Sequence, residues 1–133
     1  MKHINLSILA FITFFACTLQ SAPSAKAKVS VSSKKEGKNV TLSFATLPGE
    51  GLKINGDGPW KLEIKDAKGI KLDKFELKRD AWKEDIAGFQ VKGTPASDAK
   101  SLEIQYKMTT FVCTTDKSMC YREVVDGKES VKL

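Results

Sequence analysis

The sequence predicts an all-β protein, an antiparallel β-sandwich built as a single domain after a signal peptide. Two observations lead to this prediction. Short stretches in which apolar and polar residues alternate are separated by turn residues along most of the chain. No helical period persists for more than one turn. A succession of such short stretches, with no internal repeat and no linker, is typical of one sandwich domain.

The expected strands follow one another from residue 28 to the end of the chain. They cover residues 28–33, 40–47, 52–54, 60–65, 70–72, 75–77, 89–91 and 102–113, and two closing strands contain Val124 and Val131. The turns between them contain Gly37, Pro48-Gly49, residues 55–59, residues 66–69, residues 93–95 and Asp126-Gly127. Residues 80–88 have no regular period. This succession indicates an Ig-like architecture.

The N-terminus has the pattern of a signal peptide. Lys2 supplies a positive charge, residues 4–16 are almost all apolar, and Ala25-Lys26-Ala27 fits the small-x-small cleavage rule. The apolar stretch is shorter than the roughly 20 residues that a membrane-spanning helix needs. We therefore expect cleavage of residues 1–27, a mature domain of residues 28–133, and export to the periplasm or cell envelope.

Cys17 leaves an alternative open. It ends the sequence Phe14-Phe15-Ala16-Cys17, a loose version of a bacterial lipoprotein box, so a lipid anchor at Cys17 is the second possibility. Cleavage after Ala27 removes this cysteine and leaves two, the even number expected in an oxidising compartment. The cysteine count therefore favours simple cleavage.

Composition excludes several kinds of chemistry. The single histidine, His3, lies in the predicted signal peptide, so the mature domain has no Ser-His-Asp or Cys-His catalysis and no histidine-bound zinc. Removing residues 1–27 takes away two lysines and lowers the net charge from +6 to +4. The lysines are interspersed with acids, which is typical of a solvated surface, and no nucleic-acid partner is expected.

The two remaining cysteines, Cys113 and Cys120, enclose six mostly polar residues between a strand that leads in and a strand that leads out. This pattern predicts a hairpin with the cysteines facing each other and joined by a disulfide. The bond would stabilise the fold by about 2.5 kcal/mol on the chain-entropy estimate. It is either a structural staple or an exchangeable disulfide. Lys117 and Arg122 favour a thiolate whereas Asp116 and Glu123 oppose it, so charge leaves both interpretations open.

Two stretches resemble a known family. Residues 106–121 contain a strand, a cysteine, a short polar loop and a second cysteine followed by tyrosine. This stretch resembles the active-site hairpin of the N-terminal periplasmic domain of DsbD, the thiol:disulfide interchange protein. Residues 52–62, with Ile54-Asn55, a glycine-rich turn and Pro59, resemble an early segment of the same family. The two stretches occur in the expected order.

The resemblance implies a thiol:disulfide oxidoreductase-like exchange module with an Ig-like fold and with Cys113 and Cys120 as the redox pair. Its partners would be a separate membrane electron carrier and periplasmic thiol-disulfide proteins. The family shields its cysteines with an aromatic cap loop, which by position falls within residues 82–89, with Trp82, Ile86 or Phe89 as the shielding residue.

The sequence is also compatible with a different function. The alternative is a non-enzymatic Ig-like domain that binds a protein or envelope component and keeps the disulfide as a staple.

A metal site is the other hypothesis to weigh. Met108 and Met119 with the two cysteines form a set of soft ligands of the kind that holds Cu(I). Core and loop positions explain the methionines more simply, so no metal or cofactor is expected.

Overall fold

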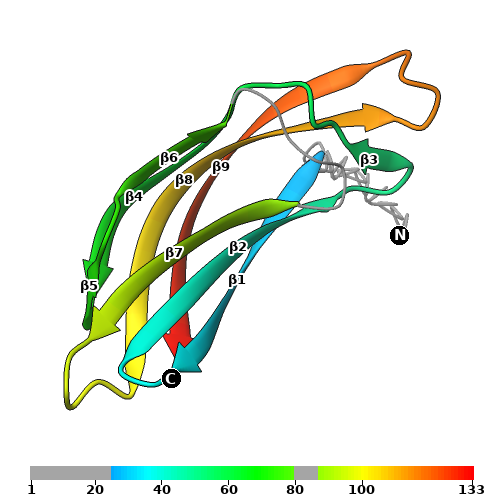
Figure 1. Cartoon of the computed structure of the whole chain (residues 1–133). Coiled ribbons are helices and arrows are strands. Elements are labelled where there is room, and N and C mark those ends of the chain that lie inside the picture. Colours follow the sequence, from blue (N-terminus) through cyan, green and yellow to red (C-terminus); the bar gives the residue numbers. More distant parts are fainter. Residues whose placement is uncertain (1–24, 80–86) are drawn as a thin grey trace, which may run out of the picture.

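The structure is a computed structural model that describes residues 25–79 and 87–133. In these residues the protein is all-β and consists of two antiparallel sheets, as the alternating pattern predicted (Figure 1). The strands are β1 (Ala27–Glu36), β2 (Asn39–Pro48), β3 (Leu52–Ile54), β4 (Trp60–Lys68), β5 (Ile70–Leu72), β6 (Glu76–Arg79), β7 (Gly88–Pro95), β8 (Ser101–Thr114) and β9 (Cys120–Lys132).

The first sheet has the strand order β1-β2-β7-β5. β1 and β2 form a hairpin in register from Ala27↔Pro48 to Glu36↔Asn39. Gly37 in its turn has a φ of 64°, a left-handed conformation that glycine adopts without steric cost. β7 continues the sheet beside β2, and the short strand β5 completes it.

The second sheet is organised around β8, the longest strand. β9 pairs with β8 along its whole length, from Ser101↔Lys132 to Cys113↔Cys120. β4 and then β3 pair with the other side of β8, and β6 pairs with β4. Figure 1 shows the β8–β9 hairpin running the length of the molecule, with its tip beside β3.

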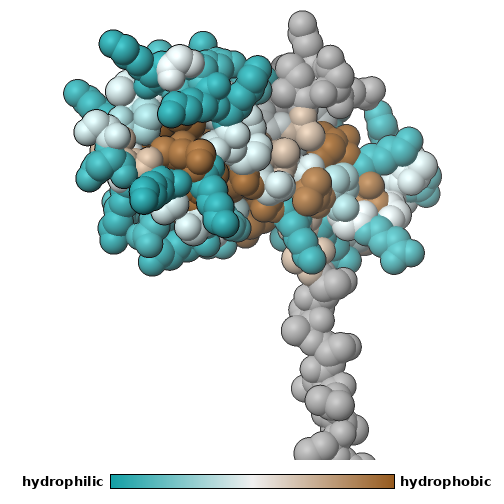
Figure 2. All heavy atoms as spheres, turned by 90° about the horizontal axis from the view of Figure 1, so that it is seen from below, coloured by the Kyte–Doolittle hydropathy of each residue, from teal (hydrophilic) through white to brown (hydrophobic). Residues whose placement is uncertain are grey.

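The core lies between the two sheets. Side chains at alternate positions point inward, and the largest fully buried ones include Trp60, Tyr106, Phe44 and Phe89. Seen from below in Figure 2, hydrophobic side chains form a band through the middle of the molecule with hydrophilic side chains on its flanks. This arrangement is consistent with a β-sandwich.

One buried polar contact joins the sheets. The hydroxyl oxygens of Thr46 in β2 and Thr110 in β8 lie 3.0 Å apart, and both residues are buried. Each hydroxyl gives the other a hydrogen-bond partner, which lowers the cost of burying the pair. It ties β8 to the opposite sheet near the end that carries Cys113.

Three of the expected turns are strand residues instead. Residues 93–95 are the last residues of β7, where they pair with β5. Asp126-Gly127 lies within the continuous strand β9, where Gly127 pairs with Tyr106. A Cβ atom on Gly127 would overlap the ring of Tyr106, so this glycine makes room for an aromatic side chain. Residues 66–68 belong to β4, which continues past a bulge between Ile64 and Asp66 and ends before Gly69. Gly69 alone has the positive φ of a turn there.

The expectations for the N-terminus fall mostly outside the described residues. Cys17 and all but the last three residues of the predicted signal peptide precede residue 25, so cleavage and lipidation stay predictions. In residues 25–79 and 87–133, no helix is long and apolar enough to cross a membrane.

The start of β1 leads to a testable prediction about the domain boundary. Ala27 is 3% exposed and pairs with Pro48, and the carbonyl of Lys26 accepts a hydrogen bond from the N–H of Gly49 at 2.8 Å. A chain that begins at Lys28 lacks both contacts. We expect residues 25–133 to be more stable than residues 28–133 by about 1–2 kcal/mol, from one methyl group and one hydrogen bond. Urea denaturation of the two chains measures this difference, and equal midpoints would contradict it.

Candidate functional site

The two cysteines face each other at the tip of the β8–β9 hairpin and are joined by a disulfide, as predicted. Their Cα atoms are 4.0 Å apart. The N–H of Thr114 donates to the carbonyl of Met119 at 2.8 Å, which makes Thr114 and Met119 a hydrogen-bonded pair. Cys113 and Cys120 are then the next, non-hydrogen-bonded pair, the position at which side chains on antiparallel strands are closest. The register of β8 and β9 therefore positions the bond.

The two halves of the disulfide differ in access to solvent. Cys113 is 5% exposed, whereas Cys120 is an exposed residue at the first position of β9. A thiolate from solution can approach Cys120 but is hindered at Cys113. Thiol-disulfide exchange depends on which sulfur can be reached, so this asymmetry gives the two cysteines different roles in any exchange reaction.

The loop between the cysteines is held by its own hydrogen bonds. The N–H of Lys117 donates to the carbonyl of Thr114 at 2.9 Å, and Lys117 has a φ of 59°. One carboxylate oxygen of Asp116 accepts bonds from the hydroxyl of Thr114 at 2.6 Å and from the N–H and hydroxyl of Ser118 at 3.0 and 2.7 Å. The loop is therefore an ordered turn centred on the Asp116 carboxylate.

These bonds perturb the acidity of the carboxyl group. Hydrogen bonds from the Thr114 hydroxyl and then from Ser118 lower the pKa of Asp116 from 3.8 to about 2. Because the pKa is lower in the folded state, the ionised carboxylate stabilises the loop at any pH above 3.8, and that stabilisation disappears as the pH falls through about 2.

We expect the order of this loop to persist at pH 3 and to be lost only near pH 2. An NMR titration of the Asp116 carboxyl carbon, with amide hydrogen exchange at Ser118, measures both effects. Asp116→Asn serves as the control, since an amide oxygen still accepts hydrogen bonds but does not titrate. A titration midpoint near 3.8 would contradict the hydrogen bonding described above.

Residues 52–62 pack beside the cysteines, on the side of β8 away from β9. β3 pairs with β8 at Lys53↔Cys113, and the N–H of Asn55 donates to the carbonyl of Phe111 at 2.9 Å. Gly58 lies against the ring of Phe111, where a Cβ atom would overlap that ring. The structure therefore brings together residues 52–62 and 106–121, which are far apart in sequence.

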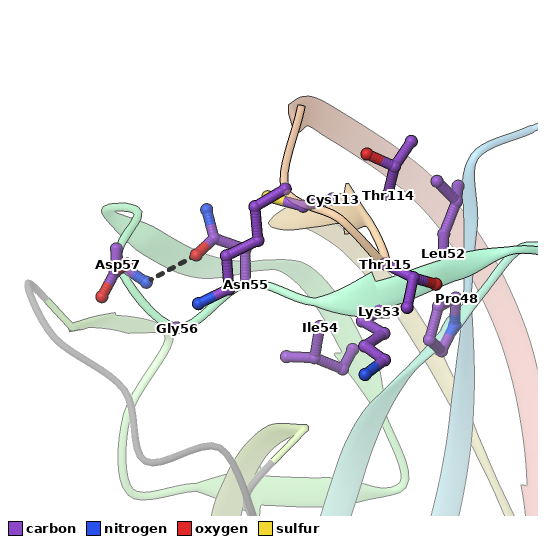
Figure 3. A pocket seen from close by; sticks show the side chains of 11 residues that line it. Pro48, Leu52, Lys53, Ile54, Asn55, Gly56, Asp57, Cys113, Thr114 and Thr115 are labelled. Atoms are coloured by element: carbon purple, nitrogen blue, oxygen red, sulfur yellow. Dashed lines mark hydrogen bonds between the residues drawn. The ribbon is translucent and has the colours of Figure 1, made fainter. Parts of the chain in front are cut away.

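A groove runs along β3 next to the disulfide. Its volume is about 450 Å³ and its walls come from the end of β2, from β3 and the turn after it, and from the end of β8 with its loop. We call it the β3 groove; its lining residues are Pro48, Leu52, Lys53, Ile54, Asn55, Gly56, Asp57, Cys113, Thr114, Thr115 and Lys117. Figure 3 shows Asp57 and Pro48 at its opposite ends and the bond from the Asp57 N–H to the Asn55 side-chain oxygen.

Successive side chains of a strand point to opposite faces of the sheet, and this alternation decides which charged residues share a face with the disulfide. Opposed residues share a face of the sheet, so Lys53 lies on the face of Cys113, and Arg122, opposite Phe111, lies on the same face. Glu123 is opposite Thr110, which points into the core, so it lies on the other face. On the disulfide face, Lys53 and Arg122 favour a thiolate on reduction, whereas the ionised carboxylate of Asp116 in the loop between the cysteines opposes it.

The β9 side of the tip carries a second group of contacts. The hydroxyl of Tyr121 donates to the sulfur of Met119 at 3.7 Å, and the ammonium of Lys26 lies 4.9 Å from the centre of the Tyr121 ring. Met119 is 55% exposed. These residues form a partly exposed, partly apolar rim at the hairpin tip.

The remaining candidate residues lie in different places. Trp82 and Ile86 of the expected cap loop are outside the described residues. Phe89 is 1% exposed and belongs to the core cluster on β7. Met108 is fully buried in the core, whereas Met119 is exposed at the loop, so the two methionines do not share an environment. In the described residues, no group of three or more His, Cys, Asp or Glu side chains could hold a metal ion.

One residue of the site carried no clear signal in the sequence. Lys53 is one among many lysines, and only the pairing of β3 with β8 brings it to the groove that Lys117 also lines. Comparison with protein-family models, curated proteins and solved structures finds no match to this chain. The inference about function therefore depends on the residues and geometry of the site.

Proposed function

We propose that this protein is an exported thiol-disulfide exchange module that relays electrons through Cys113 and Cys120. The observation that carries the proposal is an exposed Cys120 bonded to a buried Cys113 at a hairpin tip. Exchange needs one sulfur that an external thiolate can reach and one that leaves as a thiolate. At the hairpin tip, Cys120 is the accessible sulfur and Cys113 is the leaving one.

The reaction proceeds in two balanced steps. A partner thiolate attacks the sulfur of Cys120, a partner–Cys120 disulfide forms, and the Cys113–Cys120 bond breaks with its electron pair on Cys113. A second thiolate of the partner then attacks the partner's sulfur atom in the mixed disulfide. The partner is released with an internal disulfide, and Cys120 is released as a thiolate. Protons from solvent complete the dithiol, which has gained two electrons. The reverse sequence passes them on.

Three features support a relationship with the N-terminal domain of DsbD. The two resemblance stretches are adjacent in space, the all-β fold with two antiparallel sheets is compatible with an Ig-like sandwich, and Cys120 is followed by Tyr121. On this proposal the protein acts in the periplasm or cell envelope. A separate membrane electron carrier and periplasmic thiol-disulfide proteins are its partners.

The burial of Cys113 favours a second candidate function. A cysteine that is 5% exposed is protected in the way expected of a structural staple, and the loop at the tip is already ordered by its own hydrogen bonds. An Ig-like domain that binds an envelope component and never exchanges its disulfide is the alternative. The two functions differ in whether the native protein reacts with thiols.

A native-state exchange experiment separates them. The oxidised protein is mixed with reduced thioredoxin, quenched with acid at intervals and alkylated, and mass spectrometry counts the alkylated cysteines. We expect Cys113 and Cys120 to become reduced in native buffer while the circular dichroism spectrum of the folded protein is retained. A pair that stays oxidised until denaturant is added would contradict the exchange function and support the staple.

A further inference from the structure

β3 presents a free edge to the groove. Because Asn55 and Phe111 are a hydrogen-bonded pair, the alternation of an antiparallel ladder makes Lys53 and Cys113 one too. Ile54 lies between these pairs, so its N–H and carbonyl point away from β8. Among the described residues, no strand pairs with this edge of β3. It can therefore accept an additional strand, as exposed sheet edges do in peptide recognition.

The groove beside this edge is lined by two lysines and one aspartate. Lys53 and Lys117 line it, and in the described parts of the chain neither has a carboxylate within 4.0 Å, whereas Lys61, Lys65 and Lys78 on the same sheet are ion-paired. The one acidic lining residue, Asp57, lies at the end of the groove away from Pro48 (Figure 3). The unpaired ammonium groups match a ligand that carries carboxylates.

We propose that the β3 groove binds an acidic, extended segment of the thiol partner, which adds a strand to β3 and places carboxylates beside Lys53 and Lys117. This inference rests on the proposed exchange function and specifies which partner the disulfide serves. The backbone of the segment bonds to the free edge at Ile54. The positive charges of Lys53 and Lys117 favour an acidic partner over neutral or basic ones.

Docking here is compatible with attack on Cys120. A strand added to β3 lies three strand spacings from β9, about 14 Å. That distance corresponds to about four or five extended residues. The docking segment and the reactive cysteine of the partner are therefore different parts of its chain. The segment positions the partner while its thiolate approaches the exposed sulfur.

The test uses blocked peptides without a thiol, so binding is measured apart from exchange. The probes are acetyl-EDVSVDE-amide and its basic counterpart acetyl-KKVSVKK-amide, titrated into the oxidised protein labelled with nitrogen-15. We expect the acidic peptide to shift the amide signal of Ile54 and the basic peptide to leave it unchanged. Replacing both lysines, as Lys53→Gln with Lys117→Gln, should weaken binding of the acidic peptide about three- to tenfold.

A matched variant controls for net charge. Lys71→Gln with Lys92→Gln removes two exposed lysines from the other sheet and should leave the affinity unchanged. Equal binding of the two peptides, equal weakening by the two double variants, or no shift at Ile54 would overturn the proposal. If the disulfide exchanges but the acidic peptide does not bind, the docking inference fails alone. If the peptide binds but the disulfide does not exchange, the exchange function fails and the groove remains a peptide site.

Discussion

Replacing Cys113 with serine should leave a thiol that reacts rapidly with an external disulfide, whereas replacing Cys120 should leave a thiol that reacts at least about tenfold more slowly. The reason is access, since Cys120 is exposed and Cys113 is 5% exposed. The rate of mixed-disulfide formation with oxidised glutathione, followed by mass spectrometry, measures the difference. The Cys113→Ser protein should also accumulate a stable mixed disulfide with a partner variant that keeps only its reactive cysteine, because neither protein then has a second thiol that resolves the bond.

The two variants control for each other. Each removes the same crosslink, worth about 2.5 kcal/mol on the chain-entropy estimate, and urea denaturation of both measures the further cost of the hydroxyl that Cys113→Ser places at a buried position. A difference in reaction rate at equal stability therefore reports the position of the sulfur and not general loosening of the fold. Equal rates for the two thiols would contradict the asymmetry on which the proposed mechanism depends.

Gly88→Ala should destabilise the protein by more than about 4 kcal/mol, close to the whole stability of a domain of this size. Gly88 pairs with Ala45, and a Cβ atom there would overlap the backbone carbonyl of Phe44 and lie 2.8 Å from the Cα of Ala45. Backbone atoms cannot turn aside as a side chain can, so β2 and β7 would have to separate. Thermal denaturation followed by circular dichroism measures the loss.

Gly37→Ala is the matched control for this prediction. It makes the same chemical change in the β1–β2 turn, where nothing lies within 4 Å of the added Cβ atom and only the φ of 64° is unfavourable. We expect it to cost about 1 kcal/mol. If Gly88→Ala costs no more than Gly37→Ala, the close approach of β2 and β7 described here is wrong.

Much of the fold could be predicted because apolar and polar residues alternate strictly along half-buried strands. The inward positions of β4, at Trp60, Leu62 and Ile64, and those of β8 follow directly from the pattern. The turn predicted at Asp126-Gly127 was wrong because an Asp-Gly pair is a strong hairpin signal in sequence alone. Which strand lies opposite and which ring needs space there, in this case that of Tyr106, depends on tertiary structure.

The site could be predicted only in part for a similar reason. The hairpin and its disulfide followed from the spacing of Cys113 and Cys120 between two strands. Local sequence does not say that β3 pairs with β8 at Cys113, nor that Cys113 is covered while Cys120 is open. These facts depend on contacts between segments about sixty residues apart. They also decide which charged strand residues share the face of the disulfide, namely Lys53 and Arg122 but not Glu123.

The most direct test of the exchange function is the reduction potential of the Cys113–Cys120 pair in the purified protein, equilibrated in glutathione and dithiothreitol buffers. We predict a potential of roughly −120 to −270 mV, the range of known exchange proteins, with the fold retained after reduction. A potential below about −300 mV, or unfolding on reduction, would contradict the relay and identify the bond as a structural staple.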